Sequence, residues 1–289
     1  MNIGFAITTL GSHRPIERLL KSLAGQLDHN DWIVISAVGD GQRIRTIVDE
    51  LDFGPARVTV VDGPRGAAAG RNFAVHSAPH LADFILFPND TSWFPSDFVE
   101  TFKSQDIRGT AGALTVVDEF GPKFRLAQSG AGLTRKNVWN VIEPGLFMDH
   151  QTFLSLGGFD ESIGTGAPTP WQSGEGTELL LRWMESRIEE YFEWIHCPHV
   201  LGISDPQGLS DSERRVKLRA YARGYGRLLV TGNFVAIDRF KAVAGGVSFG
   251  LRKGHPYKPI DGLWVFVGRI EGITGRLMSR KSMIRAVER

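Results

Sequence analysis

Apolar and polar residues alternate in two different periods along the first hundred positions. Four short apolar runs have the length of a buried strand: residues 3–10, 32–38, 58–61 and 84–87. Three segments between them place apolar residues at helical spacing: residues 16–26, 44–51 and 66–76. Residues 11–15, which contain Gly and Pro, are expected to form a turn. Short strands that alternate with helices predict a parallel, doubly wound sheet.

This alternation changes after about residue 104. Strands are predicted at residues 109–117, 123–127, 145–148, 191–195 and 200–203. The first two have no long helix between them, which indicates antiparallel pairing. Asp149 is expected to cap a helix over residues 151–156 that ends at Gly157 and Gly158. A longer helix is predicted over residues 175–188.

From residue 212 onward the pattern is mainly helical. The apolar segment 263–267 either packs back on the body of the protein or lies at an interface. We predict one domain over residues 1–205, divided into a first half (1–104) and a second half (105–205). A basic, mainly helical extension follows over residues 206–289.

Composition is that of an ordinary globular protein, with 42% hydrophobic and 22% charged residues among 289. The single cysteine, Cys197, excludes a disulfide framework within the chain and a cysteine-based zinc site. The chain shows neither a secretory leader nor an apolar run of about 18 residues that would span a membrane. We therefore expect a cytoplasmic protein that is not integral to a membrane.

Charge is unevenly distributed along the chain. Residues 238–289 contain 11 Lys or Arg against 4 Asp or Glu, although the net charge of the whole chain is only +1. Just upstream, one predicted helix carries six further cations: Arg214, Arg215, Lys217, Arg219, Arg223 and Arg227. This asymmetry indicates an anionic partner surface, lipid or nucleic acid, unless the cations form an ordinary solvated helical face.

Candidate binding residues follow the predicted strands, at the edge where open α/β sheets bind ligands. They are Thr8, Thr9, Asp40, Arg71, Asn89, Asp90 and Thr91. Short polar groups and a carboxylate can bind a base and ribose, while Arg71, in a helix start rich in Gly and Ala, can approach a diphosphate. Oxygen ligands at residues 89–91 suit a hard divalent cation, although an Asn-Asp turn is the equally plausible structural interpretation.

No Walker lysine motif occurs, and the first turn lacks the Gly-x-Gly-x-x-Gly pattern, which argues against an ordinary ATPase or dehydrogenase. Four further segments occur in a defined order: GAAAGRN (66–72), FILFPNDT (84–91), GGFDE (157–161) and GEGTELLLR (174–182). As a set, over residues 3–201, they resemble the family-2 glycosyltransferases of GT-A fold. The expected fold is therefore a GT-A-like, doubly wound mixed α/β sheet with a Rossmann-like nucleotide half, an acceptor half and a helical C-terminal extension.

This resemblance implies a nucleoside diphosphate (NDP) sugar donor, with UDP the expected nucleotide, and Mg²⁺ or Mn²⁺ held against the diphosphate by a DxD-type loop. It places Thr8, Thr9 and Asp40 at the nucleoside, Arg71 near the donor, and residues 89–91 in the metal loop. His199, after the penultimate strand, is a weaker candidate for the metal. The acceptor is expected to be a saccharide or lipid-linked saccharide, because segments 219–227 and 268–275 resemble the tails of bacterial enzymes that make surface polysaccharides or glycolipids.

The sequence departs from the family pattern at two places. Asp90 is the single carboxylate of a loop in which two or three are usual. Gly176 occupies the position where the acceptor-side helix normally places its base, so Glu175 becomes the expected general base of an inverting transfer, with Glu178 one turn further along. An ion pair between Glu178 and Arg182 is the alternative for that residue.

Two more residues complete the acceptor side. Asp160 is expected to hold acceptor hydroxyls or to serve as the base, and Trp171 to stack on a sugar ring, with loop packing the alternative for Trp171. The predicted function is inverting, metal-assisted hexosyl transfer in polysaccharide biosynthesis, at the inner face of an anionic membrane and without nucleic acid. Two alternatives stay open: a non-catalytic nucleotide-sugar or glycan binder, and a sugar nucleotidyltransferase, for which the loop at residues 11–14 is a poor match.

Overall fold

The structure is a computed structural model that describes the chain except for residues 11–15, 187–190, 203–208, 252–256 and 279–289. The predicted turn at 11–15 and the ends of two predicted elements, residues 187–188 and 203, lie outside the described residues. The chain forms two compact units. The first comprises residues 1–159 and 179–204, and the second comprises residues 160–178 and 205–289.

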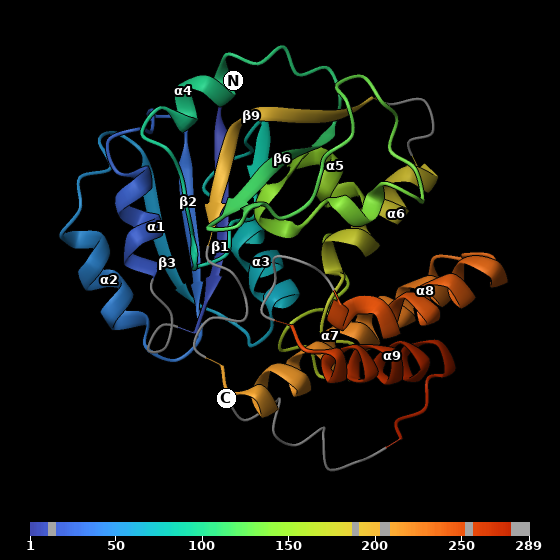
Figure 1. Cartoon of the computed structure of the whole chain (residues 1–289). Helices are drawn as coiled ribbons and strands as arrows, with labels where there is room; N and C mark the ends of the chain where they lie inside the picture. Colours follow the sequence, from blue (N-terminus) through green and yellow to red (C-terminus); the bar gives the residue numbers. More distant parts are fainter. Residues whose placement is uncertain (11–15, 187–190, 203–208, 252–256, 279–289) are drawn as a thin grey trace. The chain divides into compact units, whose positions relative to one another are not determined.

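The first unit is built on a mixed sheet of nine strands in the order β3-β2-β1-β4-β8-β6-β9-β5, with β7 paired to β6 (Figure 1). Its first half contains β1 (Ile3–Thr9), α1 (Ile16–Leu23), β2 (Trp32–Ala37), α2 (Gly41–Asp49), β3 (Arg57–Asp62), α3 (Ala67–His76) and β4 (Phe84–Leu86). Strands β1 to β4 pair in parallel. The predicted doubly wound half is confirmed, element by element.

The second half of this unit contains β5 (Ser92–Trp93), α4 (Phe98–Lys103), β6 (Ala111–Asp118), β7 (Gly121–Pro122), β8 (Leu146–Asp149), α5 (His150–Ser155) and β9 (Phe192–Gly202), with 3₁₀ turns at Val138–Asn140 and Glu143–Gly145. Strand β8 pairs antiparallel with both β4 and β6, whereas β6 and β9 are parallel. As predicted, Asp149 caps α5, because its side chain accepts a hydrogen bond of 2.7 Å from the Thr152 amide.

Two strand predictions were wrong. Residues 123–127 form no strand; the hairpin partner of β6 is the two-residue strand β7, and the chain then leaves the sheet. Residues 191–195 and 200–203 were predicted as two separate strands. The structure has one strand, β9, that runs through the cis Cys197–Pro198 bond and accommodates it at a register shift opposite residues 114–116 of β6.

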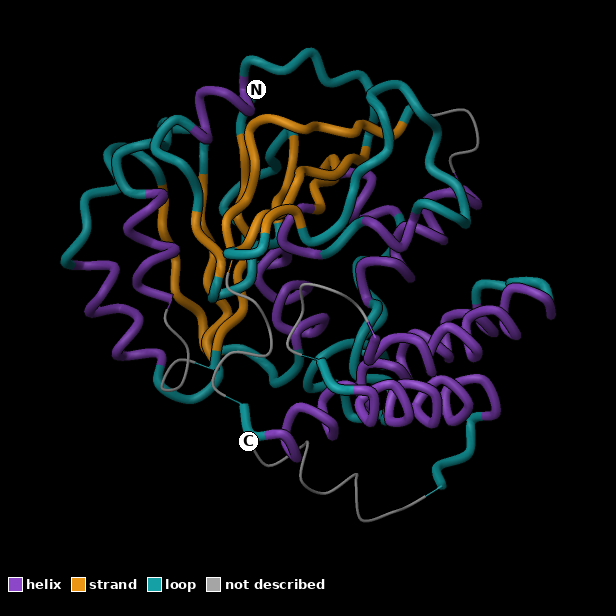
Figure 2. Tube along the Cα trace, in the orientation of Figure 1, coloured by secondary structure: helices purple, strands orange, loops and turns teal. Residues whose placement is uncertain are grey.

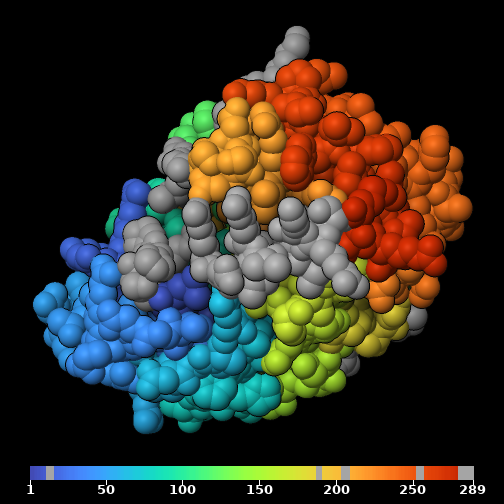
Figure 3. Space-filling view, turned by 90° about the horizontal axis from the view of Figure 1, so that it is seen from below, coloured from blue at the N-terminus to red at the C-terminus, as the bar shows by residue number. Residues whose placement is uncertain are grey.

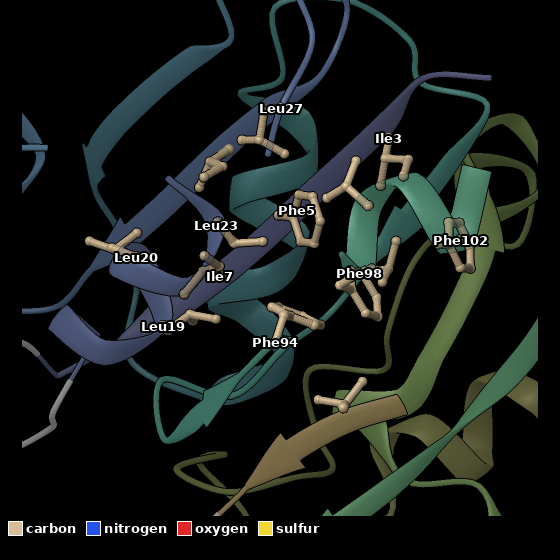
Figure 4. Packing of buried hydrophobic residues seen from close by; sticks show 14 of the residues in the cluster. Ile3, Phe5, Ile7, Leu19, Leu20, Leu23, Leu27, Phe94, Phe98 and Phe102 are labelled. Atoms are coloured by element: carbon tan, nitrogen blue, oxygen red, sulfur yellow. The ribbon is translucent and has the colours of Figure 1, made fainter. Parts of the chain in front are cut away.

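Helices cover both faces of the sheet (Figure 2). Alternate residues of β1, including Phe5 and Ile7, pack with α1 and α4 in a core rich in phenylalanine (Figure 4). The rings of Phe94 and Phe98 in this core lie 4.2 Å apart between centroids. On the opposite face, the ring of Trp32 fills the space where a side chain at Gly4 would lie, 2.2 Å from the position of its Cβ.

The second unit consists of a loop, residues 160–174, the first residues of α6 (Glu175–Ser186), and the helices α7 (Asp211–Thr231), α8 (Ala236–Ser248) and α9 (Pro259–Thr274), with a 3₁₀ turn at Phe249–Leu251. Atoms of α7, in light orange, adjoin those of α9, in red (Figure 3). Glycines permit this close approach, since a Cβ at Gly268 or Gly272 would lie within 2.4 Å of a carbonyl oxygen of α7. Segment 263–267 lies within α9.

Buried ion pairs join α7 to α9. Asp261 accepts hydrogen bonds from Arg214 and Arg215, and Glu271 accepts them from Arg219 and Arg223. The interpretation of this helix as an anion-binding surface was therefore wrong for these four arginines, because their guanidinium groups neutralise two carboxylates that are fully buried. Sequence alone could not separate a solvated basic helix from one whose anionic partners lie about fifty residues away.

Candidate functional site

The carboxyl ends of the parallel strands lie at one edge of the sheet. In register, Thr9 of β1 stands beside Ala37 of β2, which stands beside Asp62 of β3. The loops that follow these strands begin at the same edge, and residues 87–91 follow β4 there. The arrangement matches the expected location of a ligand site in an open α/β sheet.

The loop of Asn89 and Asp90 is fastened to the end of β1. Asn89 forms a parallel bridge with Thr8, so the pairing of β1 with this segment resumes beyond Pro88. The Thr9 hydroxyl donates a hydrogen bond of 2.9 Å to Oδ2 of Asp90. Thr9 is buried, whereas Asp90 is half-buried and Asn89 is exposed. The single carboxylate of the loop is thereby held in place by a buried neighbour.

Arg71 approaches the same loop from α3. Its side chain is only 2% exposed, and its guanidinium donates a hydrogen bond of 2.7 Å to Oδ1 of Asn89. Helix α3 lies close to β1 because residue 70 is glycine: a Cβ there would lie 2.1 Å from the Thr8 hydroxyl. The guanidinium carbon of Arg71 also lies 5.8 Å from the centre of the Phe159 ring. Five predicted donor-side residues, Thr8, Thr9, Arg71, Asn89 and Asp90, thus lie together.

Asp40 is placed at the start of the neighbouring helix. Its carboxylate caps α2 by accepting a hydrogen bond of 3.1 Å from the Arg43 amide, and its side chain is exposed. Asp62, at the end of β3, forms an ion pair of 3.1 Å with Arg45 of the same helix. Asp40 is therefore at the expected edge of the sheet, with its carboxylate engaged as a helix cap.

The oxygen atoms near Asp90 suit a hard divalent cation in kind, since they come from a carboxylate, an amide and hydroxyl groups. Among the described residues, no group of three or more His, Cys, Asp or Glu side chains gathers in a way that could hold a metal ion. Thr91 follows Asp90 in the loop and is half-buried. His199 is not brought beside Asp90, because Ser92 and Trp93 pair with Gly202 and Leu201, which places His199 beyond Trp93.

A pair of hydrogen bonds joins two of the sequence motifs. The Asn72 side chain donates to the Phe159 carbonyl and accepts from the Phe159 amide, both at 2.9 Å, across 87 residues. In addition, Arg182 donates a hydrogen bond of 2.7 Å to the Gly158 carbonyl. Asn72 was not among the predicted site residues. Its position beside Arg71 was the available signal, since a buried amide next to a candidate ligand residue commonly orients a neighbouring loop.

The acceptor-side candidates Asp160, Trp171, Glu175 and Glu178 all belong to the second unit. Asp160 accepts a hydrogen bond of 2.9 Å from the Ser162 amide and is half-buried. Glu175 is 5% exposed and opens α6, and its carboxylate lies against Gly164, where a Cβ would be 2.9 Å from Cδ of Glu175. Glu178 is half-buried one turn later. Glu175 is thus the more enclosed of the two glutamates.

Trp171 is half-buried, and the guanidinium carbon of Arg227 lies 5.6 Å from the centre of its ring. The loop that carries Trp171 is shaped by Gln172, which accepts from the Gly166 amide and donates to the Ala167 carbonyl, each at 2.9 Å. The Ser173 hydroxyl then joins the loop to α7 by donating a hydrogen bond of 2.7 Å to the Tyr221 carbonyl. Sequence analysis missed Gln172 and Ser173, since isolated Gln and Ser residues in a loop give no pattern.

The mixed sheet, with its four parallel strands, antiparallel β8 and C-terminal helices, defines an α/β fold of the GT-A type, as the resemblance implied. Solved structures agree. The chain superposes on S. aureus TarS. The TM-score against TarS 1-349 is 0.54 with 12% identity, covering 96% of this chain and 93% of that one.

Two further structures of the same protein match. TarS 1-349 in complex with UDP-GlcNAc gives a TM-score of 0.56 with 10% identity, again covering 96% of this chain and 93% of that one. Against the longer TarS chain the TM-score is 0.54 with 13% identity, and the match covers 99% of this chain but 54% of that one. No family model and no curated protein matches the sequence. None of the described helices is long and apolar enough to cross a membrane.

Proposed function

We propose that this protein transfers a hexose, with inversion, from a UDP-sugar to a saccharide or lipid-linked saccharide acceptor on the cytoplasmic side of a membrane. The observation that carries the proposal is the cluster of Thr9, Asp90, Asn89 and Arg71 at the strand ends of a GT-A-like sheet. TarS, which has this fold, has been solved with UDP-GlcNAc and with UDP, and this supports UDP as the nucleotide.

Each side chain of the cluster has a distinct task in this proposal. Arg71 supplies a buried positive charge close to the donor diphosphate, where a guanidinium can form two parallel hydrogen bonds to phosphate oxygens. Asp90, oriented by Thr9, and Thr91 would hold Mg²⁺ or Mn²⁺, which when bound supplies positive charge against the leaving diphosphate. A site with one carboxylate is expected to bind the cation weakly until donor phosphates complete the ligands.

For the acceptor, we propose that Glu175 removes the proton of the attacking hydroxyl, and that Asp160 and Trp171 hold the sugar. Enclosure of the Glu175 carboxylate against Gly164 supports this role over Glu178, because a base needs a fixed position within reach of the acceptor hydroxyl. Glu175→Gln should lower kcat by about 100-fold or more while the donor KM changes little. An unchanged kcat would transfer the role to Glu178 or Asp160.

The decisive experiment is transfer from UDP-sugars by the wild type and by Asp90→Asn, with Mn²⁺ titrated. We expect Asp90→Asn to lower transfer by about 100-fold or more, since the replacement keeps the shape and removes the charge. Asp49→Asn, an exposed carboxylate in α2, is the matched control and should retain wild-type turnover. If Asp90→Asn transferred sugar as fast as the wild type, the cluster around Asp90 would not be the donor site, and the proposal would lose its main support.

A non-catalytic nucleotide-sugar binder is the second candidate, favoured by the single carboxylate at Asp90 and by Gly176 at the usual base position. Thermal shifts with UDP-, GDP- and dTDP-sugars, with and without Mn²⁺, identify the nucleotide in either case. Assays of donor hydrolysis and transfer then distinguish the enzyme from the binder. A non-catalytic binder is stabilised by the added ligand but neither hydrolyses nor transfers it.

A further inference from the structure

Helix α8 and the turn after it expose a continuous apolar stripe. Its members are Ile237, Phe240, Ala244, Val247 and Leu251, which recur at the spacing of one helical face. Phe240 is 70% exposed and Leu251 is 67% exposed, and Ile237 and Val247 are each 55% exposed. Single exposed apolar residues are ordinary, but a row of this length on one face is a typical feature of an interaction surface.

Helix α9 carries a second stripe. Ile260 is 44% exposed and Leu263 is 51% exposed, and the half-buried Val267 and Ile270 continue the row toward the end of the helix. These positions again follow the spacing of a single helical face. Helix α9, which carries this second stripe, packs against α8.

Both stripes face the same side of the α8–α9 pair. The helices run antiparallel, because Gly246 packs on Phe266, and Gly250, in the 3₁₀ turn after α8, packs on Lys258 and Pro259 at the start of α9. Gly246 and Gly262 mark the line along which the two helices meet, and successive residues of a helix turn by about 100° around its axis. The α8 stripe lies roughly 100° to 180° around the α8 axis from Gly246. The α9 stripe lies roughly 80° to 160° around the α9 axis from Gly262, in the same sense. Equal rotations in antiparallel helices bring both stripes to one side.

Helix α7 covers the opposite side of α9. Gly268 and Gly272, which approach α7, lie roughly 80° to 120° from Gly262 in the opposite sense. Asp261, roughly 100° from Gly262 in that same opposite sense, pairs with arginines of α7 on this side of α9, whereas the apolar stripes lie on the other side. Asp261 and Glu271 are fully buried among the arginines of α7, so neither carboxylate is available near the stripes.

Cations dominate the remaining charge of this segment. Residues 236–278 contain seven Lys or Arg and three Asp or Glu, two of which are the buried Asp261 and Glu271. Lys241, next to Phe240, and Lys258, before Ile260, are both exposed, and the ammonium of Lys258 forms an ion pair with Asp211 of α7. An apolar stripe bordered by cations has the composition of helices that lie in the interface of an anionic bilayer.

We propose that the α8–α9 face, defined by Ile237, Phe240, Val247, Leu251, Ile260 and Leu263, docks on an anionic lipid bilayer. The apolar side chains enter the headgroup region while the neighbouring lysines remain at the level of the lipid phosphates. A second copy of the chain fits this surface less well, because a two-fold contact through the same face would bring like charges together. The inference is independent of glycosyl transfer, since docking requires neither donor nor acceptor.

The test is co-sedimentation of the full chain with vesicles of phosphatidylglycerol and phosphatidylcholine, against vesicles of phosphatidylcholine alone. We expect binding to the anionic vesicles that weakens as salt is raised. Phe240→Glu combined with Val247→Glu should reduce partitioning by about tenfold or more, since each replacement removes apolar area that would leave water. Phe120→Glu, at a phenylalanine of the first unit that is 57% exposed, is the matched control and should bind as the wild type does.

Three results would overturn the proposal. The first is a wild type that does not sediment with anionic vesicles, and the second is a double variant that binds them as strongly as Phe120→Glu does. The third is a wild type that light scattering shows to be oligomeric while the double variant is monomeric, because the α8–α9 face would then contact a second copy of the chain. Circular dichroism of the double variant shows whether its helices are intact, and Ile237→Ser with Leu251→Ser offers a milder pair for the same comparison.

Discussion

The Thr9 hydroxyl donates a hydrogen bond of 2.9 Å to the Asp90 carboxylate, although 81 residues separate the two in sequence. Thr9 is buried at the end of β1 and cannot move far, so it limits the positions open to the Asp90 side chain. A carboxylate that binds a cation is oriented by hydrogen-bond donors of this kind. Loss of such a donor typically lowers metal affinity or activity by about 10- to 100-fold.

We therefore predict that Thr9→Val, which keeps the shape and removes the hydroxyl, lowers kcat/KM for the donor by about tenfold and raises the Mn²⁺ concentration for half-maximal activity. Thr9→Ser should restore most of the activity, because it returns the hydroxyl. Steady-state rates across a Mn²⁺ titration provide the measurement. If Thr9→Val responds to Mn²⁺ as the wild type does, the hydrogen bond does not orient a metal ligand.

Most of the first unit could be predicted from sequence because its elements are local patterns. Strands β1, β2 and β4 are mainly buried apolar runs, and the half-buried edge strand β3 contains the apolar residues 58–61 that predicted it. Helix α1 buries Ile16, Leu19, Leu20 and Leu23 at the spacing that predicted it. The edge of the sheet where Thr9 and Asp90 meet follows from parallel topology alone. The hydrogen bond between them does not, since it depends on the bridge from Thr8 to Asn89 beyond Pro88.

What sequence could not provide are relationships between distant side chains. The arginines of α7 form a basic cluster in the sequence, yet Asp261 and Glu271 turn that cluster into buried ion pairs. The glycines at 268 and 272 resembled a family tail motif, and the structure gives their physical role as the close contact of α9 with α7. Residues 191–195 and 200–203 suggested two strands, but one strand, β9, covers this part of the chain from Phe192 to Gly202.

Gly164 offers a test of Glu175 that leaves the glutamate itself unchanged. A Cβ at residue 164 would lie 2.9 Å from Cδ and Oε2 of Glu175, so Gly164→Ala must displace the carboxylate or its own backbone. A displacement of about 1 Å at a reacting group can lower a rate by about 100-fold. We predict that Gly164→Ala lowers kcat by about 10- to 100-fold, with the donor KM unchanged within about twofold.

Backbone strain is the competing cause, because Gly164 has a φ of +115°. Gly130→Ala controls for it: Gly130 has a φ of +81° and no atom within 4 Å of its Cβ position. Both variants should lose some stability in urea, but only Gly164→Ala should lose kcat. Wild-type kcat in Gly164→Ala would mean that the position of the Glu175 carboxylate does not limit the reaction.

Glu271 should be essential to the stability of the helical unit. It accepts hydrogen bonds of 2.9 Å from Arg219, 2.6 Å from Arg223 and 2.7 Å from the Met278 amide. Burial alone would raise the pKa of Glu271, but these hydrogen bonds outweigh burial and hold that pKa below its usual value. Glu271→Gln leaves two buried guanidinium groups without a counter-charge, and we predict a loss of about 3 to 5 kcal/mol in unfolding free energy.

Urea unfolding followed by circular dichroism measures this loss. Asp106→Asn is the control, because the ion pair of Asp106 with Arg108 is exposed to solvent and its removal should leave unfolding unchanged within error. The wild type should also lose stability in acid. The folded-state pKa of Glu271 lies below its ordinary value of 4.5, so its contribution is present above that pH and is lost as pH falls through the folded pKa.

His150 predicts a second pH effect, in a milder range. Its ring is 2% exposed, packs against Trp32 at 6.0 Å between centroids, and accepts a hydrogen bond of 3.0 Å on Nδ1 from the Ala82 amide. Burial lowers the pKa of His150 below its ordinary value of 6.5; Asp149 opposes this change, and His80 and His76 add to it. The folded state therefore binds this proton less readily than the unfolded chain does, and unfolding free energy should fall as pH drops below about 6.5, until the folded-state pKa is passed.

His150→Asn removes the titrating group and keeps an acceptor for the Ala82 amide, because the Asn side-chain oxygen occupies nearly the same place as Nδ1. We predict that the decrease of unfolding free energy between pH 6.5 and 5.5 is smaller in His150→Asn than in the wild type, whereas His29→Asn, at an exposed histidine, keeps the wild-type slope. Urea unfolding at a series of pH values supplies the comparison. Equal slopes in all three proteins would show that proton binding by the unfolded chain at residue 150 does not govern this pH range.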